Sequence, residues 1–310
     1  MRLLPIFLLA ACAESPYYTV GKPTSEIATP AGVAHQSGVF VGARGVHLFE
    51  QSWRPTGPCR AALIIVHGLK DYSGHYALAA TELASRGYAV YAFDLRGHGL
   101  SEGHRVWIDS FDDYLDDLDV FVQRVRERES GKPLFLFGHS MGGAIVTLYT
   151  LERKPPLRGL LLSGPALKRG SDISGFLAGI TRLLGTIVPN LGVLDLDNRW
   201  FSRDPQVVAG MNGDPLIYNR PGPARTAAQL LGAMSTIQDR EATLDVPVFV
   251  MHGTADRLTN PDGSKELVAT AHTPDKTLKL YQGYYHDLLH EPERAVVLGD
   301  LARWLDAHTQ

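Results

Sequence analysis

The sequence contains only two cysteines, Cys12 and Cys59, and no block of lysine or arginine residues. Two cysteines allow one disulfide at most. The net charge of -3 and the lack of a basic block leave no electrostatic footprint for a nucleic acid, so nucleic-acid binding is not expected. The composition, with 45% hydrophobic and 20% charged residues, is that of an ordinary globular protein with one large core.

The N-terminus lacks an apolar segment long enough to cross a bilayer, because its apolar run covers only Leu3 to Ala11. One positive charge precedes this run and small residues follow it, as in a signal peptide. Leu9-Ala10-Ala11-Cys12 resembles the lipobox of bacterial lipoproteins, in which the peptide is cut before the cysteine and that cysteine carries lipid. We expect residues 1–11 to be a lipoprotein signal peptide and Cys12 to be lipidated, with an ordinary secretory signal as the alternative.

The segment after Cys12 has no apolar periodicity and is rich in Pro, Ser, Thr and Gly. This composition predicts a flexible tether over residues 12–35, followed by a domain over residues 36–310. A lipidated Cys12 leaves Cys59 unpaired, so no disulfide is expected. Lipidation implies the bacterial cell envelope, and Ala13, which is not the Asp of an inner-membrane retention signal, favours the outer membrane.

The remainder of the chain alternates short apolar runs with helical patterns. Ala61 to Val66 is apolar throughout, which is typical of a strand buried on both faces of a parallel sheet. A hairpin is expected before this strand, from about Gly38 to Trp53, and helices such as His75 to Arg86 and Ser110 to Arg128 follow it. Similar runs recur at Tyr88 to Phe93, Leu134 to Phe137, Leu157 to Leu162, Val246 to Met251 and Thr277 to Tyr281. The fold class is therefore α/β, with a mostly parallel, doubly wound central sheet flanked by helices.

About 80 residues separate the strand that ends near Ser163 from the strand that starts at Val246, far more than one crossover needs. We expect an inserted helical cap at about residues 166–240, between strands 6 and 7. Residues 173–196 are rich in apolar side chains at helical spacing. Most of them are expected to pack the cap onto the domain, and a minority to line an apolar entrance for an acyl chain.

Six aspartates gather around the start of the helix from Ser110 to Arg128: Asp109, Asp112, Asp113, Asp116, Asp117 and Asp119. They lack the glycine turn and the ligand spacing of a calcium loop. Acidic residues also favour a helix N-terminus electrostatically. We interpret the cluster as a solvated helix face, and no metal site is expected.

A candidate nucleophile lies between a buried strand and a helix. The run from Leu134 to Phe137 leads directly into Gly138-His139-Ser140-Met141-Gly142-Gly143, and a helical pattern follows. Glycines flank the serine of such a nucleophile elbow because the turn is strained and the helix passes close to the strand. Ser140 is therefore predicted to be the nucleophile of a serine hydrolase.

A serine nucleophile needs a histidine base and an acid that orients it, in the chain order Ser, acid, His for this fold. Asp256 and His286 each follow a predicted strand, so both should reach the same rim of the sheet as Ser140. The rejected alternatives are Asp239 and Asp245, which precede a strand, and His290, which is expected to be structural.

The oxyanion of the reaction needs two backbone N–H donors, one after the nucleophile and one after an early strand. Met141 supplies the first and Leu69 the second, because His67-Gly68-Leu69 follows the strand that ends at Val66. His67 is expected to brace this loop and not to act as a base.

With these segments in place, the chain resembles the monoacylglycerol lipase and lysophospholipase family of α/β-hydrolases, which are serine aminopeptidase S33-like. The shared stretches, from about residue 60 to 305, are His67-Gly68 with Ser73-Gly74-His75-Tyr76, Arg96-Gly97-His98-Gly99-Leu100-Ser101-Glu102-Gly103, Gly138 to Gly143, Ser202-Arg203-Asp204, Asp214-Pro215-Leu216, Gly253-Thr254-Ala255-Asp256-Arg257-Leu258 and Tyr285-His286-Asp287-Leu288. The chain departs from the family before the Asp-Pro-Leu of the cap, where Met211-Asn212-Gly213 replaces a stretch that commonly holds a tyrosine.

The resemblance implies hydrolysis of an ester between one acyl chain and a small polar headgroup, with monoacylglycerol as the default, and no cofactor or metal. It also implies that the cap covers an apolar channel. A lysophospholipase and a broad short-chain carboxylesterase are the alternative enzymes, and a lipid-binding lipoprotein is the alternative without catalysis. The expected partners are a small lipid ester and, through Cys12, a membrane.

Overall fold

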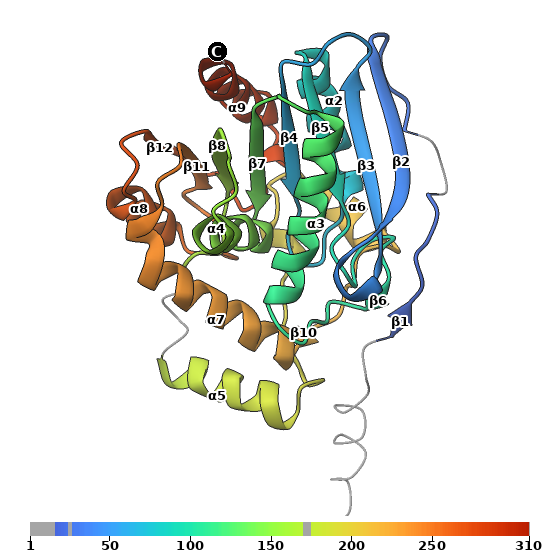
Figure 1. The fold of residues 1–310 in the computed structure, drawn as a ribbon. Coiled ribbons are helices and arrows are strands. Elements are labelled where there is room, and N and C mark those ends of the chain that lie inside the picture. The colour runs from blue at the N-terminus through green and yellow to red at the C-terminus, as the bar shows by residue number, and fades with distance from the viewer. Residues whose placement is uncertain (1–15, 24–26, 170–174, 310) are drawn as a thin grey trace, which may run out of the picture.

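The computed structural model describes residues 16–23, 27–169 and 175–309, and Figure 1 shows a central sheet with helices on both of its faces. The predicted signal peptide and Cys12 lie outside these described residues. Within them, no helix is both long enough and apolar enough to cross a membrane.

The central sheet has eight strands in the order β12-β11-β8-β7-β4-β5-β3-β2. Neighbouring strands from β12 to β5 pair in parallel, whereas β5, β3 and β2 pair antiparallel and form one edge. The bounds are β2 Val33–Val41, β3 His47–Pro55, β4 Ala61–Val66, β5 Tyr88–Phe93, β7 Leu134–His139, β8 Gly159–Ser163, β11 Val248–Gly253 and β12 Lys276–Tyr281. The α/β fold class predicted from the sequence is therefore confirmed.

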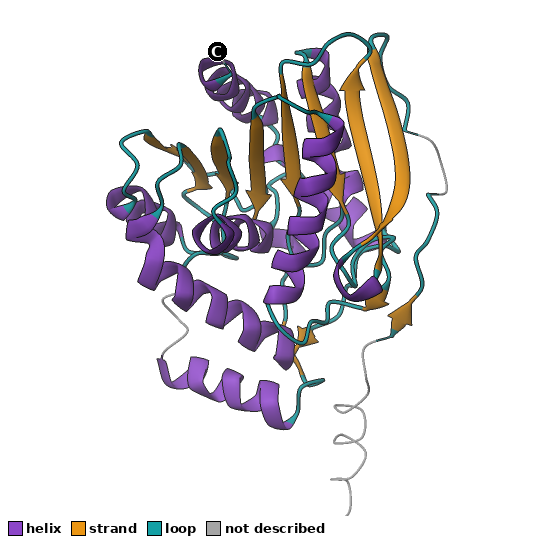
Figure 2. Ribbon diagram, in the orientation of Figure 1, coloured by secondary structure: helices purple, strands orange, loops and turns teal. Residues whose placement is uncertain are grey.

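The two faces of the sheet carry separate apolar cores, and strand β4 contributes to both. Its side chains alternate, so that Ile64 packs into one core while Leu63 and Ile65 pack into the other. Helices α3 (Asp112–Arg128), α4 (Met141–Arg153) and α8 (Pro261–Thr270) cover the first face, and α2 (Ala77–Ser85) and α9 (Arg294–His308) cover the second (Figure 2). Burial on both sides explains why this strand is apolar at every position.

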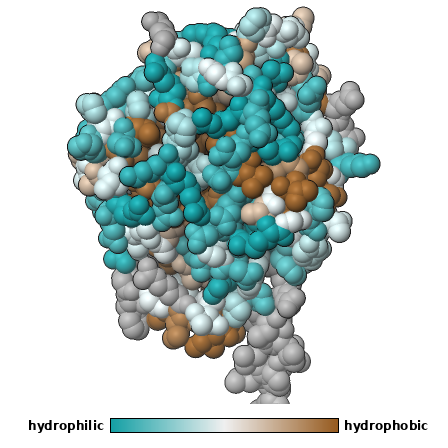
Figure 3. All heavy atoms as spheres, in the orientation of Figure 1, coloured by the Kyte–Doolittle hydropathy of each residue, from teal (hydrophilic) through white to brown (hydrophobic). Residues whose placement is uncertain are grey.

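The described part of the insertion between β8 and β11, the sixth and seventh strands of the sheet in chain order, contains three α-helices and two short strands. They are α5 (Gly175–Ile187), β9 (Gly192–Leu194), α6 (Pro205–Gly213), β10 (Gly222–Pro223) and α7 (Ala224–Arg240). Helix α7 lies between α4 and α5 and so joins the cap to the sheet domain. The outer side of α5 carries Ile180, Leu183 and Ile187, which are exposed and form an apolar surface at the lower edge of Figure 3. These three side chains do not pack the cap onto the domain.

The N-terminal segment differs from the flexible tether predicted over residues 12–35, because the described part from Pro16 onwards contacts the domain. Strand β1 (Tyr17–Tyr18) pairs antiparallel with β6 (Gly103–His104). The Tyr17 hydroxyl donates a hydrogen bond of 2.6 Å to Glu102. The Arg105 guanidinium lies 4.2 Å from the centre of the Tyr18 ring.

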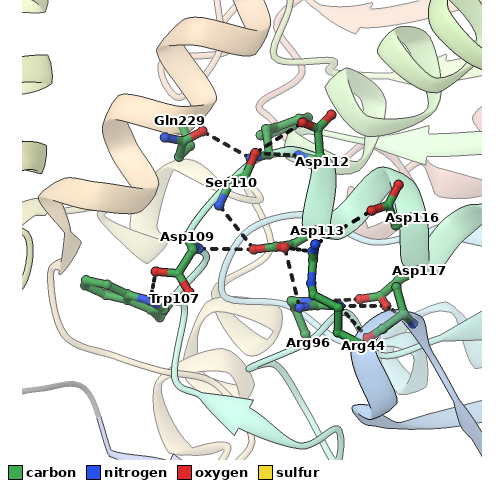
Figure 4. Close-up of polar contacts among 12 residues, drawn as sticks. Arg44, Arg96, Trp107, Asp109, Ser110, Asp112, Asp113, Asp116, Asp117 and Gln229 are labelled. Carbon is green, nitrogen blue, oxygen red and sulfur yellow. Dashed lines mark hydrogen bonds and ion pairs between the residues drawn. The ribbon is translucent and has the colours of Figure 1, made fainter.

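The aspartate cluster of α3 is a buried ion-pair network in part, and the solvated-face interpretation is wrong for Asp113 and Asp117 (Figure 4). Asp117 is fully buried and accepts hydrogen bonds of 2.6 and 2.8 Å from the Arg96 guanidinium. Asp113 pairs with Arg44 and accepts the backbone N–H of Ser110 at 3.1 Å. Both arginines lie outside α3, 69 positions before Asp113 and 21 positions before Asp117, so no local sequence pattern predicted these ion pairs. No group of three or more His, Cys, Asp or Glu residues in the described ranges is arranged to hold a metal ion.

Candidate active site

Ser140 occupies a strained turn between β7 and α4, as a nucleophile elbow requires. Its backbone torsions are φ 54° and ψ −121°, a region that costs a residue with a side chain about 1–3 kcal/mol. The turn is held by the Ser140 N–H, which donates to the Ser163 carbonyl at 3.0 Å, and by the Ser140 carbonyl, which accepts from Ala166 at 2.9 Å. A side chain at Gly142 would lie 2.1 Å from the Val66 carbonyl oxygen, so α4 approaches β4 only through glycine.

Asp256 and His286 meet at the carboxyl ends of β11 and β12. The Nδ1–H of His286 donates a hydrogen bond of 2.8 Å to Asp256 Oδ2, and both side chains are buried. Burial alone would lower the pKa of His286, but the Asp256 carboxylate outweighs it and raises that pKa above its ordinary value. The neighbour of Ser140 in the chain, His139, places its ring 4.7 Å from the His286 ring, so the elbow and this pair lie at one site.

The loop that carries Leu69 lies against Ser140. A Cβ atom on Gly68 would be 3.0 Å from the Ser140 Cβ, so this approach also requires glycine. Among the described residues, none accepts a hydrogen bond from the backbone N–H of Leu69 or of Met141, which leaves both donors free for an oxyanion. Leu69 is buried, and Met141 is the first residue of α4.

His67 braces this loop, as the sequence predicts. Its Nε2 accepts the N–H of Leu95 at 2.9 Å, and its Nδ1–H therefore donates to the Gly68 carbonyl at 2.7 Å. Both ring nitrogens are thus occupied by backbone groups. His67 cannot serve as the base of the reaction in this arrangement.

The sequence analysis did not predict that a second histidine, besides His286, contacts the Asp256 carboxylate. His252, on β11, is fully buried, with Nε2 3.1 Å from Asp256 Oδ2 and Nδ1 2.7 Å from the Ser264 hydroxyl. An ionisable residue at the end of an otherwise apolar strand, four positions before the predicted acid, was the available signal. The backbone N–H groups of Leu258 and Thr259 donate to the other oxygen of Asp256 at 2.8 and 3.0 Å.

The rejected candidates take no part in this hydrogen-bonded arrangement. His290 donates to Asp287 at 2.8 Å and to the backbone carbonyl of His75 at 3.0 Å, so its two ring nitrogens are occupied. Asp239 and Asp245 are exposed and precede β11.

The cap closes over the base. Phe201 of the cap lies edge-on to the His286 ring at 5.5 Å, and the Asp287 N–H donates to the Phe201 carbonyl at 2.8 Å. The backbone N–H of His286 itself reaches the Trp200 carbonyl at 3.4 Å. Ser140 retains 9% of its exposure and His286 only 1%, so a substrate enters an enclosed site.

Comparisons with known proteins agree on the family. Residues 57–293 match the family described as serine aminopeptidase, S33. The chain is 35% identical to the monoacylglycerol lipase of Mycolicibacterium smegmatis, over 87% of this chain and 96% of that protein. It is 34% identical to the monoglyceride lipase of Homo sapiens, over 91% of this chain and 94% of that protein.

Solved structures give the same result. The crystal structure of the Paleococcus ferrophilus monoacylglycerol lipase matches with a TM-score of 0.76 and 31% sequence identity, over 84% of this chain and 99% of that one. The family match spans most of the chain, and these relatives are matched along nearly their whole length. The chain therefore belongs to the serine aminopeptidase S33 family of α/β-hydrolases.

Proposed function

We propose that this chain is a carboxylic ester hydrolase that cleaves monoacylglycerols, or similar lipid esters with one acyl chain, through an acyl-enzyme on Ser140. The observation that carries the proposal is the hydrogen-bonded pair Asp256 and His286 beside a strained Ser140, at the rim where two free backbone N–H groups also lie. Similarity to monoacylglycerol lipases along almost the whole chain supports the substrate class.

In the first half of the reaction, His286 Nε2 takes the proton of the Ser140 hydroxyl while the serine oxygen attacks the ester carbonyl. The N–H groups of Leu69 and Met141 bind the resulting oxyanion. Collapse of the tetrahedral intermediate breaks the bond to the glycerol oxygen, and the His286 imidazolium returns its proton to that oxygen. Glycerol leaves, and the acyl group remains esterified to Ser140.

In the second half, water takes the place of glycerol. His286 removes a proton from the water, whose oxygen attacks the acyl carbon, and the same backbone donors bind the second oxyanion. The bond to Ser140 breaks, the serine oxygen regains the proton from His286, and the fatty acid leaves. Asp256 keeps the imidazole in the required tautomer and stabilises its charged form in both halves.

Replacement of Ser140 tests the chemistry. The Ser140→Ala protein should lose hydrolysis of a soluble short-chain ester and of 1-monoacylglycerol, with the fold retained. The wild-type protein should react with a fluorophosphonate probe, and the variant should not. Absence of labelling in the folded wild-type protein would instead favour a lipid-binding lipoprotein without catalysis.

Headgroup preference separates the proposal from its two enzyme alternatives. We expect higher kcat/KM for 1-monoacylglycerol than for lysophosphatidylcholine of the same acyl length. A preference for lysophosphatidylcholine would indicate a lysophospholipase, and a steady fall in kcat/KM with acyl length would indicate a short-chain carboxylesterase. Apolar side chains on the outside of α5 support a substrate that is delivered from a lipid phase.

The proposal extends to the location of the enzyme. A lipidated Cys12 would anchor the domain in a bacterial cell envelope, with the outer membrane favoured by Ala13. The lipobox-like Leu9-Ala10-Ala11-Cys12 supports this step. Metabolic labelling with a fatty acid should mark the wild-type chain and not the Cys12→Ser chain; equal labelling of both would rule out this anchor.

A further inference from the structure

One carboxylate of the cap binds two side chains of the segment that follows the Leu69 loop. Asp214, at the end of α6, accepts a hydrogen bond of 2.7 Å from the Tyr72 hydroxyl. The same carboxylate lies 3.6 Å from His75 Nε2. The cap is therefore joined to the short helix Ser73–Tyr76, three residues after the oxyanion loop begins to turn at Lys70.

The other ring nitrogen of His75 holds the carboxylate that shapes this loop. His75 Nδ1 lies 2.6 Å from Asp71 Oδ1. The buried Asp71 also accepts the backbone N–H of Tyr72 at 2.8 Å and that of Gly68 at 3.4 Å. The Asp71 carboxylate thus accepts hydrogen bonds from both ends of the turn that contains Leu69. In this turn Lys70 has a φ of 56°.

His75 also contacts the loop of the base. Its backbone carbonyl accepts the Nε2–H of His290 at 3.0 Å, and the Nδ1–H of His290 donates to Asp287, the residue after His286. The histidine therefore lies at a junction of three parts: the cap, the oxyanion loop and the loop of the catalytic base.

The charges around His75 come from each element packed against it. Asp71 and Asp214 face its ring nitrogens, and the Tyr72 and His290 rings lie 4.4 and 6.0 Å away. Asp287 pairs with His290, and the Tyr76 hydroxyl donates a hydrogen bond of 2.8 Å to Asp71. Burial alone would lower the pKa of His75, but its interactions with the Asp214 and Asp71 carboxylates raise it to about 10. The His75 charge in turn lowers the pKa of Asp214 to about 2. At neutral pH His75 is therefore an imidazolium, which donates from Nδ1 to Asp71 and pairs by charge with Asp214.

We propose that His75 is a positioning residue, which links Asp214 of the cap to Asp71 of the oxyanion loop and so makes the direction of the Leu69 N–H depend on cap closure. The inference rests on the proposed ester hydrolysis. When the cap carboxylate leaves, Asp71 and its turn lose their link to the cap, and the oxyanion donor is no longer fixed.

The test uses kcat and KM for a soluble short-chain ester and for 1-monoacylglycerol. We expect His75→Gln and Asp214→Asn each to lower kcat by about 10- to 100-fold with a smaller change in KM, because an oxyanion donor acts mainly in the transition state. The double variant should be no worse than the poorer single variant. His75→Arg, whose guanidinium keeps the charge and two donors, should restore most of the kcat.

The matched control is Arg240→Gln. It removes another link between the cap and the domain, the hydrogen bond to Glu152 on α4, and should leave kcat unchanged.

The pH dependence separates positioning from mere structural support. Activity that needs the His75 imidazolium is present below its raised pKa and is lost as the pH rises through about 10. The wild-type kcat should fall there, whereas the His75→Arg kcat should persist, with circular dichroism as a check that both remain folded. A lower melting temperature of His75→Gln without a change in kcat or in this pH limb would overturn the inference.

Two failures are distinguishable. A folded wild-type protein without any Ser140-dependent hydrolysis would overturn the proposed function, and this inference with it. An active wild-type protein with His75→Gln and Asp214→Asn both within twofold of its kcat would overturn the inference alone. If His75→Gln does not fold, Asp214→Asn decides by itself, since it changes one partly exposed carboxylate of the cap.

Discussion

At the scale of single residues, the acid of the site is surrounded by donors. Asp256 receives two backbone N–H groups on one oxygen, and His286, His252 and the Thr259 hydroxyl on the other. Burial alone would raise its pKa, but the charge on His286 and the hydrogen bond of His252 lower it well below the ordinary range. Asp256 is therefore a carboxylate throughout the pH range in which His286 titrates.

The pH profile of kcat/KM tests this arrangement through Asp256→Asn. His286 accepts a proton only when neutral, so activity is lost as the pH falls through its raised pKa. Without the carboxylate, that acid limb should move to lower pH, and kcat/KM at its plateau should fall by about 10³- to 10⁴-fold because the tautomer is no longer fixed. Asp245→Asn, at an exposed rejected candidate, should change neither. An acid limb that stays in place in Asp256→Asn would show that another group sets it.

At the scale of elements, the contact between α4 and β4 fixes where the nucleophile lies. Gly142→Ala would place a methyl group 2.1 Å from the Val66 carbonyl oxygen, and backbone cannot yield as a flexible side chain does. We expect a loss of about 1–3 kcal/mol or more in the free energy of unfolding, with reduced kcat, because α4 must shift away from the strand. Urea unfolding measures the change in the free energy of unfolding, and ester hydrolysis measures the change in kcat.

The control for this prediction is a glycine within another helix. A Cβ atom on Gly232 of α7 has no neighbour within 4 Å, so Gly232→Ala should gain up to about 1 kcal/mol from helix propensity alone. Equal effects of the two substitutions would contradict the close approach at Gly142.

The buried ion pair between α3 and the loop at Arg96 is a second contact between elements. Asp117→Ala leaves the Arg96 guanidinium, only 11% exposed, without its bidentate partner, and it removes the acceptor of the Ala43 N–H. Removal of one partner of a buried pair costs about 3–5 kcal/mol. Asp112→Ala, on the exposed side of the same helix, should cost less than about 1 kcal/mol. Equal urea midpoints for the two variants would instead support the interpretation of the whole cluster as a solvated helix face.

At the scale of the whole molecule, the sequence predicts strands and turns that have a local pattern. It does not predict contacts between residues that are distant in the chain. The strands Ala61–Val66 and Tyr88–Phe93 agree with their predicted bounds, because burial on both faces leaves an uninterrupted apolar run. Ser140 was predictable because its elbow carries its own glycines. The link from Asp71 to the cap was not, since it runs through His75 to Asp214, which lies 139 positions further along the chain than His75.

The attachment of the N-terminal segment also belongs to the scale of the whole molecule, because this segment docks onto the domain beside the cap. Strand β1 pairs with β6, and two residues after β6 the Val106 carbonyl accepts the Thr226 hydroxyl of α7 at 2.7 Å. Within the cap, the Ala224 N–H at the start of α7 donates a hydrogen bond of 2.7 Å to the carbonyl of Leu191, which lies shortly after the end of α5. The first described residue is Pro16, so a lipidated Cys12 would be separated from the docked segment by about 14 Å of extended chain at most.

So short a spacer, combined with the proposed anchor, would orient the domain with the apolar side of α5 toward the bilayer. A fluorophore on Leu183→Cys should be quenched by brominated lipids in vesicles that carry the lipidated protein, whereas one on Arg303→Cys should not, because α9 lies at the opposite end (Figure 1). Cys59 is buried and does not compete for the label. Insertion of about 20 Gly and Ser residues after Cys12 should reduce the difference, since a flexible chain lets the domain turn. Equal quenching at both positions in an acylated protein would exclude this orientation and leave the anchor in place.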